Sequence, residues 1–355
     1  MDKIGELSRV GQMDFVVPLC KNNMIIRTTI ESIVYNYHPR NIYIITNSKD
    51  AIYLESISKK WDIENTIIST INEEEFFMKN YDLTKHDIEQ YYTFIDKESR
   101  EFGWWYQQIL KLGAYKQIEN LSDPYVVWDS DLIVLQKWDL FDSNDGMYKF
   151  AILQECSKNE FNKNEYAKSI KQLIGFDSIE PPIEGTFVPH HFIMHHNVLE
   201  SLTKMIEESH NSDDDSWIKI IISLSKQYYR FSEYKCLATF MRQHFPELLL
   251  FYPFELYGKN GIRYRDSIDI VEKMKEFCEN ELRCKVVPLI LTLEKNAHID
   301  LWLNPLKKLQ ELADKQLYPN KKQAEGIVVR PSNYPRGYSS RRPLGFKLIN
   351  RNYKD

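Results

Sequence analysis

Cysteine pairs, a secretory leader and long apolar runs are all missing from this 355-residue sequence. Its five cysteines form no CxxC pair, and their odd number in a chain of this size argues against a disulfide framework or a structural zinc site. Residues 1–13 are polar and contain no apolar segment of the kind that a secretory signal needs. No stretch approaches the ~20 apolar residues required to cross a bilayer. We therefore expect a cytoplasmic protein in a reducing compartment, with no membrane span.

A strong excess of charge of either sign is also missing. The formal net charge is −5, so no global field draws the chain toward nucleic acid or an anionic membrane. The length allows one large domain or two. Aromatic residues are abundant, with 22 Tyr, 18 Phe and 7 Trp. Most of them should be core or half-buried residues, although Tyr and Trp also suit stacking on sugars and bases.

Apolar runs alternate with helical segments along the first 135 residues. The predicted strands are 15–20, 41–46, 66–71 and 125–128, and the predicted helices are 25–35, 52–61 and 103–117. This alternation is typical of an α/β layer with a mostly parallel sheet. Residues 73–100 have no clean period, and we interpret them as a helical insertion or a mobile loop.

The second half of the chain contains further predicted strands and helices, and we place a domain boundary near residue 265. Strands are predicted at 148–153, 187–194, 248–252 and 286–293, and helices at 198–209, 217–228, 232–244, 268–282 and 305–316. We expect one domain over 1–265 and a small α+β segment over 266–355.

Two carboxylates, Asp129 and Asp131, follow the predicted strand 125–128 and precede another apolar run at 132–135. In an open α/β sheet, ligands bind at the carboxyl edge of the strands. Ionised carboxylates between two buried segments are costly unless a cation or strong donors compensate them. Mn²⁺ or Mg²⁺ would do so and would keep positions open for phosphate oxygens. The alternative is a plain turn, which Asp-Ser-Asp also favours.

The segments GWWYQQILKL at 103–112 and YVVWDSDLIVL at 125–135 resemble a family of uncharacterised proteins related to GT-A glycosyltransferases. The opening FVVPLCKNN and the runs 186–199 and 231–234 resemble further segments of that family in the same order, so the resemblance spans most of 14–260. It implies a GT-A-like, mostly parallel sheet flanked by helices and a divalent cation at Asp129 and Asp131. It also implies transfer of a hexosyl or pentosyl group from a nucleotide-sugar donor to a carbohydrate or glycoconjugate acceptor.

With this resemblance, residues at the strand ends and on the helix 103–117 become candidate donor-binding residues. They are Leu19, Lys21, Asn22, Thr46, Gln107, Gln108, Lys111, Asp129 and His191. On the helix, Trp105, Ile109 and Leu112 recur at the spacing of a core stripe. The two glutamines and the lysine lie together on the neighbouring face with Trp104, where they could hold phosphate or sugar hydroxyls. The alternative is an ordinary solvated face.

Four of the nine histidines lie in the segment 188–196. The resemblance matches a family histidine to His191, where a neutral imidazole could complete the metal shell or bond the diphosphate. A structural histidine is the alternative. Asp131, the second carboxylate of the pair, is a metal and catalytic candidate.

Glu233 follows Ser232, a good helix N-cap, and should lie in the first turn of the predicted helix 232–244. There it could accept a proton from an acceptor hydroxyl, as an inverting transferase requires. The alternative is an acid favoured by the helix dipole. Lys235 departs from the family pattern, in which an acid is expected after Ser-Glu-Tyr, and this leaves the acceptor side less defined.

The C-terminal segments EGIVVR and FKLIN resemble the last two nucleotidyltransferase motifs of RNA ligases. The resemblance gives Glu325 a role in metal binding and Lys347 a phosphate contact. Covalent nucleotidyl transfer also needs a nucleophilic lysine in a KxDG context, which this sequence lacks. We therefore expect 266–355 to be an RNA-ligase-like fragment without ligase activity. Seven Lys or Arg against one acid from Arg330 onward keep a nucleic-acid-binding module as an alternative, beside an RNA-ligase-like nucleotidyltransferase.

Overall fold

The computed structural model describes most of the chain up to residue 252 and four short strands beyond it. The described residues are 13–252, except 23–25, 62, 64, 93–99, 135–136, 138, 143–146, 152, 155–159, 181–184, 211–215 and 225–229, together with 261–264, 290–293, 326–329 and 346–349. The chain divides into two units. The first comprises Met1–Ile30, Tyr37–Ser130 and Asp139–Gly258, and the second comprises Glu31–Asn36, Asp131–Trp138 and Lys259–Asp355.

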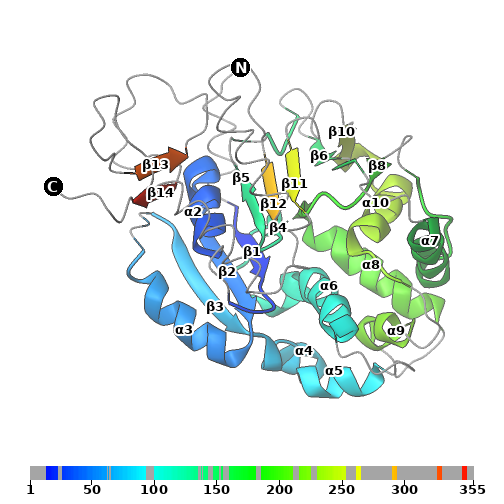
Figure 1. Ribbon diagram of the computed structural model, residues 1–355. Coiled ribbons are helices and arrows are strands. Elements are labelled where there is room, and N and C mark those ends of the chain that lie inside the picture. Colours follow the sequence, from blue (N-terminus) through cyan, green and yellow to red (C-terminus); the bar gives the residue numbers. More distant parts are fainter. Residues whose placement is uncertain are drawn as a thin grey trace. The chain divides into compact units, whose positions relative to one another are not determined.

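A five-stranded, mostly parallel sheet forms the centre of the first unit, in the order β3-β2-β1-β4-β9 (Figure 1). Its strands are β1 (Phe15–Pro18), β2 (Asn41–Thr46), β3 (Ile67–Asn72), β4 (Tyr125–Trp128) and β9 (His191–Met194). The pairs of β1 with β2 and β4, and of β2 with β3, are parallel, whereas β9 runs antiparallel to β4. Every residue of β1 and β4 is buried, as their unbroken apolar runs predict for central parallel strands.

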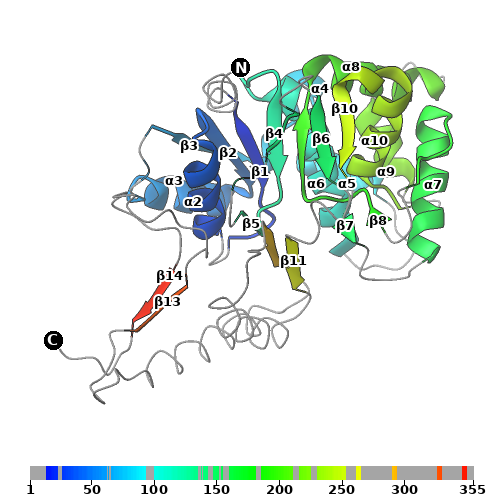
Figure 2. The same cartoon turned by 90° about the horizontal axis from the view of Figure 1, so that it is seen from above.

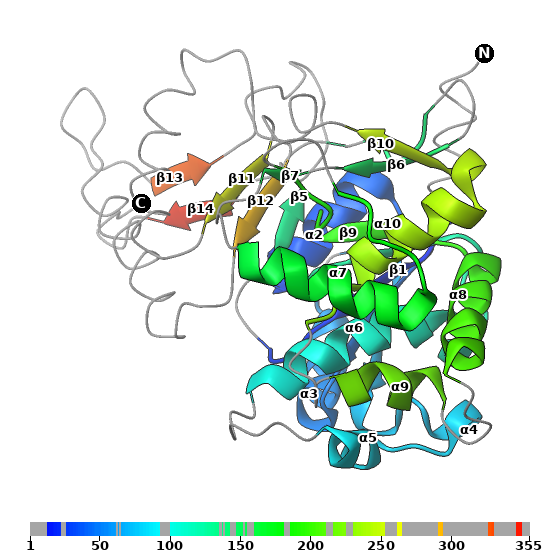
Figure 3. The same ribbon diagram turned by 90° about the vertical axis from the view of Figure 1, so that its right-hand side faces the viewer.

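Helices surround this sheet and complete the core. They are α2 (Ile26–Tyr37), α3 (Ser48–Ser58), α4 (Met78–Tyr81), α5 (Lys85–Tyr91), α6 (Arg100–Gln117), α7 (Glu160–Ile174), α8 (His196–Ser209), α9 (Trp217–Ser223) and α10 (Glu233–His244), with short 3-10 turns η1 (Glu73–Glu75) and η3 (Pro246–Leu248). Helices α6, α7, α9 and α10 all contact α8, and they are grouped together in two views (Figures 2 and 3). Their apolar faces form one continuous cluster with β4 and β9. None of the helices among the described residues is long and apolar enough to cross a membrane.

The expected mostly parallel sheet flanked by helices is confirmed, with differences in detail. Residues 73–92, part of the segment without a clean period, form η1, α4 and α5, and the capping box of Thr84 with Asp87 begins α5. The predicted strand 148–153 is instead two strands, β6 (Tyr148–Ala151) and β7 (Leu153–Gln154), which pair with β10 (Leu249–Tyr252) and β8 (Gly185–Thr186) respectively.

Two other predicted elements are shorter than expected. The strand predicted at 187–194 begins only at His191, because His190 has a left-handed φ of 64° that a strand cannot contain. The helix predicted at 217–228 ends at Ser223, and residues 225–229 lie outside the described part of the chain.

The second unit contains two small sheets. Strands β5 (Leu132–Val134), β12 (Ile290–Leu293) and β11 (Gly261–Tyr264) form one, in which β12 is antiparallel to β5 and parallel to β11. Strands β13 (Gly326–Val329) and β14 (Phe346–Ile349) form an antiparallel pair that places Lys347 opposite Val328. Glu325 and the predicted helices 268–282 and 305–316 lie outside the described residues.

Candidate active site

The parallel strands β1, β2 and β4 end at one edge of the first unit's sheet, and polar residues follow them there. Leu19 is buried, and its N–H donates to the Ile45 carbonyl at 2.8 Å, which extends the ladder beyond β1. Thr46 ends β2; it is fully buried, and its Oγ1 has no hydrogen-bond partner among the described residues. Asp129 follows β4 directly. This edge is where an open α/β sheet binds its ligands.

The loop after β1 is attached to the start of α3. The Asn22 N–H donates to Asp50 Oδ2 at 2.8 Å, and the same oxygen accepts from Asn47 Nδ2 at 2.9 Å. Asn47 is the N-cap of α3, because its side chain accepts from the Asp50 N–H at 3.0 Å. Lys21 is exposed in this loop. The loop after β1 and the start of α3 are therefore joined by hydrogen bonds through Asp50.

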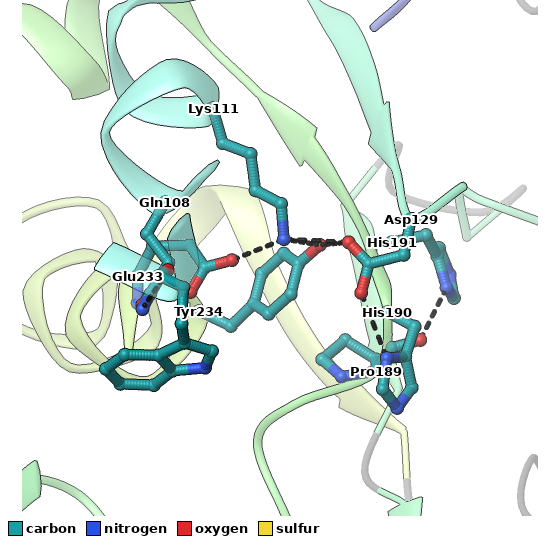
Figure 4. A network of polar contacts seen from close by, with 9 residues as sticks. Gln108, Lys111, Asp129, Pro189, His190, His191, Glu233 and Tyr234 are labelled. Atoms are coloured by element: carbon teal, nitrogen blue, oxygen red, sulfur yellow. Dashed lines mark hydrogen bonds and ion pairs between the residues drawn. The ribbon is translucent and has the colours of Figure 1, made fainter. Parts of the chain in front are cut away.

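Lys111, on the fourth turn of α6, is the centre of a buried network (Figure 4). Its Nζ lies 2.6 Å from Glu233 Oε1, 2.7 Å from Asp129 Oδ1 and 3.2 Å from the Tyr234 hydroxyl. The side chain is only 3% exposed. An ammonium has three protons to donate, and three acceptors surround this one. Tyr234 in turn donates from its hydroxyl to Asp129 Oδ1 at 3.1 Å.

The network fixes the charge of its members. Burial would lower the pKa of Lys111, but the charges of Asp129 and Glu233 outweigh burial and hold that pKa well above its usual value. Burial would raise the pKa of Asp129, but the Lys111 charge and the hydrogen bond from His190 outweigh it and lower that pKa. Lys111 is therefore an ammonium and Asp129 a carboxylate at neutral pH. The Asp129 carboxylate is therefore compensated by Lys111, Tyr234 and His190. These are the cation and the strong donors that a buried carboxylate needs.

Glu233 is positioned by helix capping and by Gln108. Ser232 is the N-cap of α10, and its Oγ accepts from the Lys235 N–H at 3.3 Å. The Glu233 N–H donates to Gln108 Oε1 at 2.9 Å, and Gln108 Nε2 donates to the Trp104 carbonyl at 3.1 Å. No described residue donates a hydrogen bond to Glu233 Oε2. The Glu233 side chain is 5% exposed.

Two consecutive histidines lie beside Asp129. The Asp129 N–H donates to the His190 carbonyl at 2.9 Å, and His190 Nδ1 lies 3.0 Å from Asp129 Oδ2. His191 pairs with Trp128 in the β4–β9 ladder, and its Nδ1 lies 3.0 Å from the Pro189 carbonyl. Burial lowers the pKa of His191 to about 4. A neutral imidazole whose Nδ1–H donates to a carbonyl carries its lone pair on Nε2.

The fold thus gathers Gln108, Lys111, Asp129, His191 and Glu233 from α6, β4, β9 and α10. Gln107 is half-buried and makes no side-chain hydrogen bond with a described residue. Asp131 is half-buried and belongs to the second unit. Among the described residues, no three His, Cys, Asp or Glu side chains form a group that could hold a metal ion.

Sequence reasoning missed two members of the network, Tyr234 and His190. Tyr234 lies in a segment that resembles the family, directly after Glu233, so its position carried a usable signal. His190 carried none, because a left-handed histidine cannot be recognised from local sequence. Lys235, the departure from the family pattern, is buried and pairs with Glu180 at 2.7 Å.

A family model described as "Family of unknown function (DUF6492)" matches residues 15–252, and the chain belongs to this family. No curated protein sequence matches the chain. Similar solved structures include mouse xyloside xylosyltransferase 1 in its apo form, with 12% identity, a TM-score of 0.46, and coverage of 80% of this chain and 98% of that one. The galactosyltransferase LgtC in complex with donor and acceptor sugar analogs has 11% identity, a TM-score of 0.39, and coverage of 87% and 98%. GlyE of Streptococcus pneumoniae TIGR4, a glycosyltransferase, has 10% identity, a TM-score of 0.40, and coverage of 86% and 67%.

Proposed function

We propose that the protein is a glycosyltransferase that moves a sugar from a nucleotide-sugar donor to an acceptor hydroxyl. The observation that carries the proposal is the buried network in which Lys111 joins Asp129 to Glu233. Asp129 stands at the carboxyl edge of the sheet, where a donor would bind. Glu233 holds one carboxylate oxygen against Lys111 and leaves the other without a donor among the described residues. The resemblance of 14–260 to GT-A-related proteins supports the same assignment.

On the donor side, the candidate residues lie along the ends of β1 and β2. The loop residues Lys21 and Asn22 would contact the nucleotide, and the buried Leu19 and Thr46 would form the wall behind it. Gln107 is a further candidate on α6. Lys111 has a different role from direct phosphate binding, because its three acceptors already surround it. It would keep the Asp129 carboxylate ionised and contact both carboxylates at the same time.

On the acceptor side, Glu233 would act as the general base. Its Oε2 would take the proton of an acceptor hydroxyl while the oxygen attacks the anomeric carbon and the bond to the donor's diphosphate breaks. The proton ends on Glu233, the sugar on the acceptor oxygen, and the electron pair on the diphosphate. Such a step would be an inverting transfer, which needs a base on the side opposite the leaving group.

A divalent cation, Mn²⁺ or Mg²⁺, is a separate part of the proposal. The donor types fit, because carboxylates and a neutral imidazole are ligands that Mn²⁺ accepts. Asp129 Oδ2, which accepts from His190 alone among the described residues, and His191 would hold it. The resemblance adds Asp131 to these ligands. When bound, such an ion stabilises the negative charge of a leaving diphosphate.

Calorimetric binding of nucleoside diphosphates and nucleotide sugars, with and without Mn²⁺, tests the proposal. Wild type should bind at least one member of a panel of UDP, GDP and their hexose conjugates, and binding should need the metal. The double variant Asp129→Ala/Asp131→Ala should lose this binding, whereas Asp123→Asn, outside the site, should keep it. If the double variant bound the nucleotide with unchanged affinity and without metal, the assignment of Asp129 and Asp131 to the donor site would be wrong. A covalent nucleotide adduct after incubation with labelled ATP or GTP would favour the ligase-like alternative instead.

A further inference from the structure

Two half-buried aromatic side chains lie beside each other and have no part in the proposed function: Trp104 of α6 and Tyr166 of α7. Their ring centroids are 6.4 Å apart, and their planes are inclined by only 27°. The buried Trp105 ring meets the Trp104 ring at 88°, with centroids 5.7 Å apart. No described residue accepts a hydrogen bond from the Trp104 indole N–H. The aromatic pair therefore offers flat apolar faces and one polar donor at the border of the core.

The same two helices hold the two residues that precede the N-cap of α10. On α6, the Trp105 ring stacks on Phe231, with centroids 6.2 Å apart and planes inclined by 16°. On α7, Ser169 lies one turn after Tyr166, and its Oγ donates to the Arg230 carbonyl at 2.5 Å. Each ring of the pair is therefore carried by a helix that is attached to the start of α10.

The contacts along α6 place Trp104 on the Glu233 side of the buried network. The Trp104 carbonyl accepts from Gln108 Nε2, and Gln108 Oε1 accepts from the Glu233 N–H. Lys111, further along the helix, contacts Glu233 and Asp129 together (Figure 4). With a rise of about 1.5 Å per residue, Trp104 is ~6 Å from Gln108 and ~10 Å from Lys111 along the helix axis. The aromatic pair therefore lies on the acceptor side of the proposed base.

A sugar ring has a face of C–H groups and a rim of hydroxyls. Flat aromatic rings bind the face through apolar contact, and an indole N–H can donate to a hydroxyl of the rim. We propose that Trp104 and Tyr166 form the acceptor site and that the acceptor is a carbohydrate. One of its sugar rings packs on the aromatic pair, the Trp104 N–H donates to a hydroxyl of that ring, and another hydroxyl reaches Glu233. The inference rests on the proposed function and adds the chemical class of the acceptor.

Transfer kinetics test this site with the nucleotide sugar that wild type binds. The acceptor probes are the methyl glycosides of glucose, galactose and xylose at millimolar concentration. Hydrolysis of the donor is followed alongside, because water needs no aromatic surface. Trp104→Ala removes the ring, whereas Trp104→Phe keeps a flat ring and loses the N–H. Tyr53→Ala is the control, because it removes an aromatic ring that is 50% exposed on α3. Thermal midpoints, measured beside wild type, report whether each variant is folded.

We expect Trp104→Ala to lower kcat/KM for the glycosides about tenfold or more, mainly through a higher acceptor KM. Donor affinity and donor hydrolysis should stay within about twofold of wild type. Trp104→Phe should lose roughly threefold, the effect of one neutral hydrogen bond, and Tyr53→Ala should behave as wild type. If Trp104→Ala does not fold, Tyr166→Ala must show the same division between transfer and hydrolysis.

Equal losses in transfer and hydrolysis would overturn the inference, because Trp104 would then only position Glu233 through Gln108. Unchanged transfer to the glycosides in the folded variants would also overturn it. Failure of wild type to glycosylate any of the glycosides, while it binds the donor, would do the same; transfer to a serine-containing peptide instead would leave the proposed function intact. Wild type that binds no nucleotide sugar would refute the proposed function and, with it, this inference.

Discussion

The two ends of the β4–β9 ladder carry the same pairing of residues in different surroundings. Asp129 follows β4, and its Oδ2 lies 3.0 Å from His190 Nδ1. Asp123 precedes β4, and its Oδ1 lies 2.8 Å from His195 Nδ1. At the first end the enclosed Lys111 adds a second contact to the aspartate at 2.7 Å. At the other end the aspartate is 39% exposed and also accepts from the His196 N–H at 3.1 Å, which satisfies a free N–H at the start of α8.

The comparison teaches that an Asp–His pair has no fixed role. At the carboxyl edge of the parallel strands, low exposure and a buried ammonium turn the pair into part of a charged network. At the opposite edge, solvent screens the pair, and Asp123 also accepts from an N–H at the start of α8. The two ends therefore differ through Lys111 and through burial, and not through the presence of an Asp–His pair.

The largest expected effect comes from removing the cation of the buried end. Lys111→Met keeps the length of the side chain but leaves Asp129 and Glu233 without their shared counter-ion. We expect the free energy of unfolding to fall by about 3–5 kcal/mol, as for other broken buried ion pairs. Urea denaturation measures it, with Lys171→Met as the matched control, because that lysine is 63% exposed and should cost less than about 1 kcal/mol. If the free energy of unfolding of Lys111→Met fell by no more than that of the control, Lys111 would not be the shared counter-ion of the two buried carboxylates.

The pH dependence of stability should show the burial of His191. The folded ring takes up a proton only near pH 4, since burial lowers its pKa to about 4, whereas the unfolded ring does so near pH ~6.5. Between these values the unfolded chain binds more protons, so stability rises with pH and is lost as pH falls from ~6.5 toward 4. The full difference is on the order of 3 kcal/mol.

Urea denaturation in EDTA at several pH values would test this. His191→Gln should flatten the slope in that window. His86→Gln, which changes an exposed histidine of α5, should leave the slope as in wild type. Identical slopes for His191→Gln and wild type would refute the assignment.

Glu233→Gln should separate acceptor chemistry from donor binding. The amide cannot accept the proton of the acceptor hydroxyl, so we expect transfer to fall by ~10²-fold or more. The affinity for the donor should be kept, because Asp129 and the ends of β1 and β2 are unchanged. Transfer rate and donor affinity are measured on the same preparation. If Glu233→Gln lost its affinity for the donor instead, Glu233 would be a donor-binding residue and not the base for the acceptor.

The smallest effect is expected at the exposed end of the ladder. Asp123→Asn retains an oxygen that can accept from the His196 N–H and removes only the charge opposite His195. We expect a loss of stability of about 1 kcal/mol or less and no change in transfer. An effect on stability or transfer as large as that of Lys111→Met would remove the distinction between the two ends.

Much of the fold could be predicted because strands and helix caps are local signals. The runs at 15–20 and 125–128 are apolar without interruption, and 41–46 is apolar between Asn41 and Thr46, a pattern typical of buried parallel strands. Ser232 predicted the start of α10, since its side chain caps the first turn. Interruptions within a predicted strand or helix were harder to predict from the sequence. The end of the strand before His191 depends on one backbone angle at His190, and residue type did not indicate it.

The sequence by itself predicted the strands and the polar residues that follow their ends, because polarity and periodicity act over a few residues. Tertiary structure alone decided their pairing and charge. Lys111 and Glu233 are 122 residues apart along the chain, and His190 and Asp129 are 61 apart. Contacts over such distances depend on how α6 and α10 pack against β4 and β9, which no local pattern specifies. Burial then decides the outcome, since a lysine at this position on a solvated face would be hydrated and could bind phosphate, whereas the enclosed Lys111 is committed to two carboxylates.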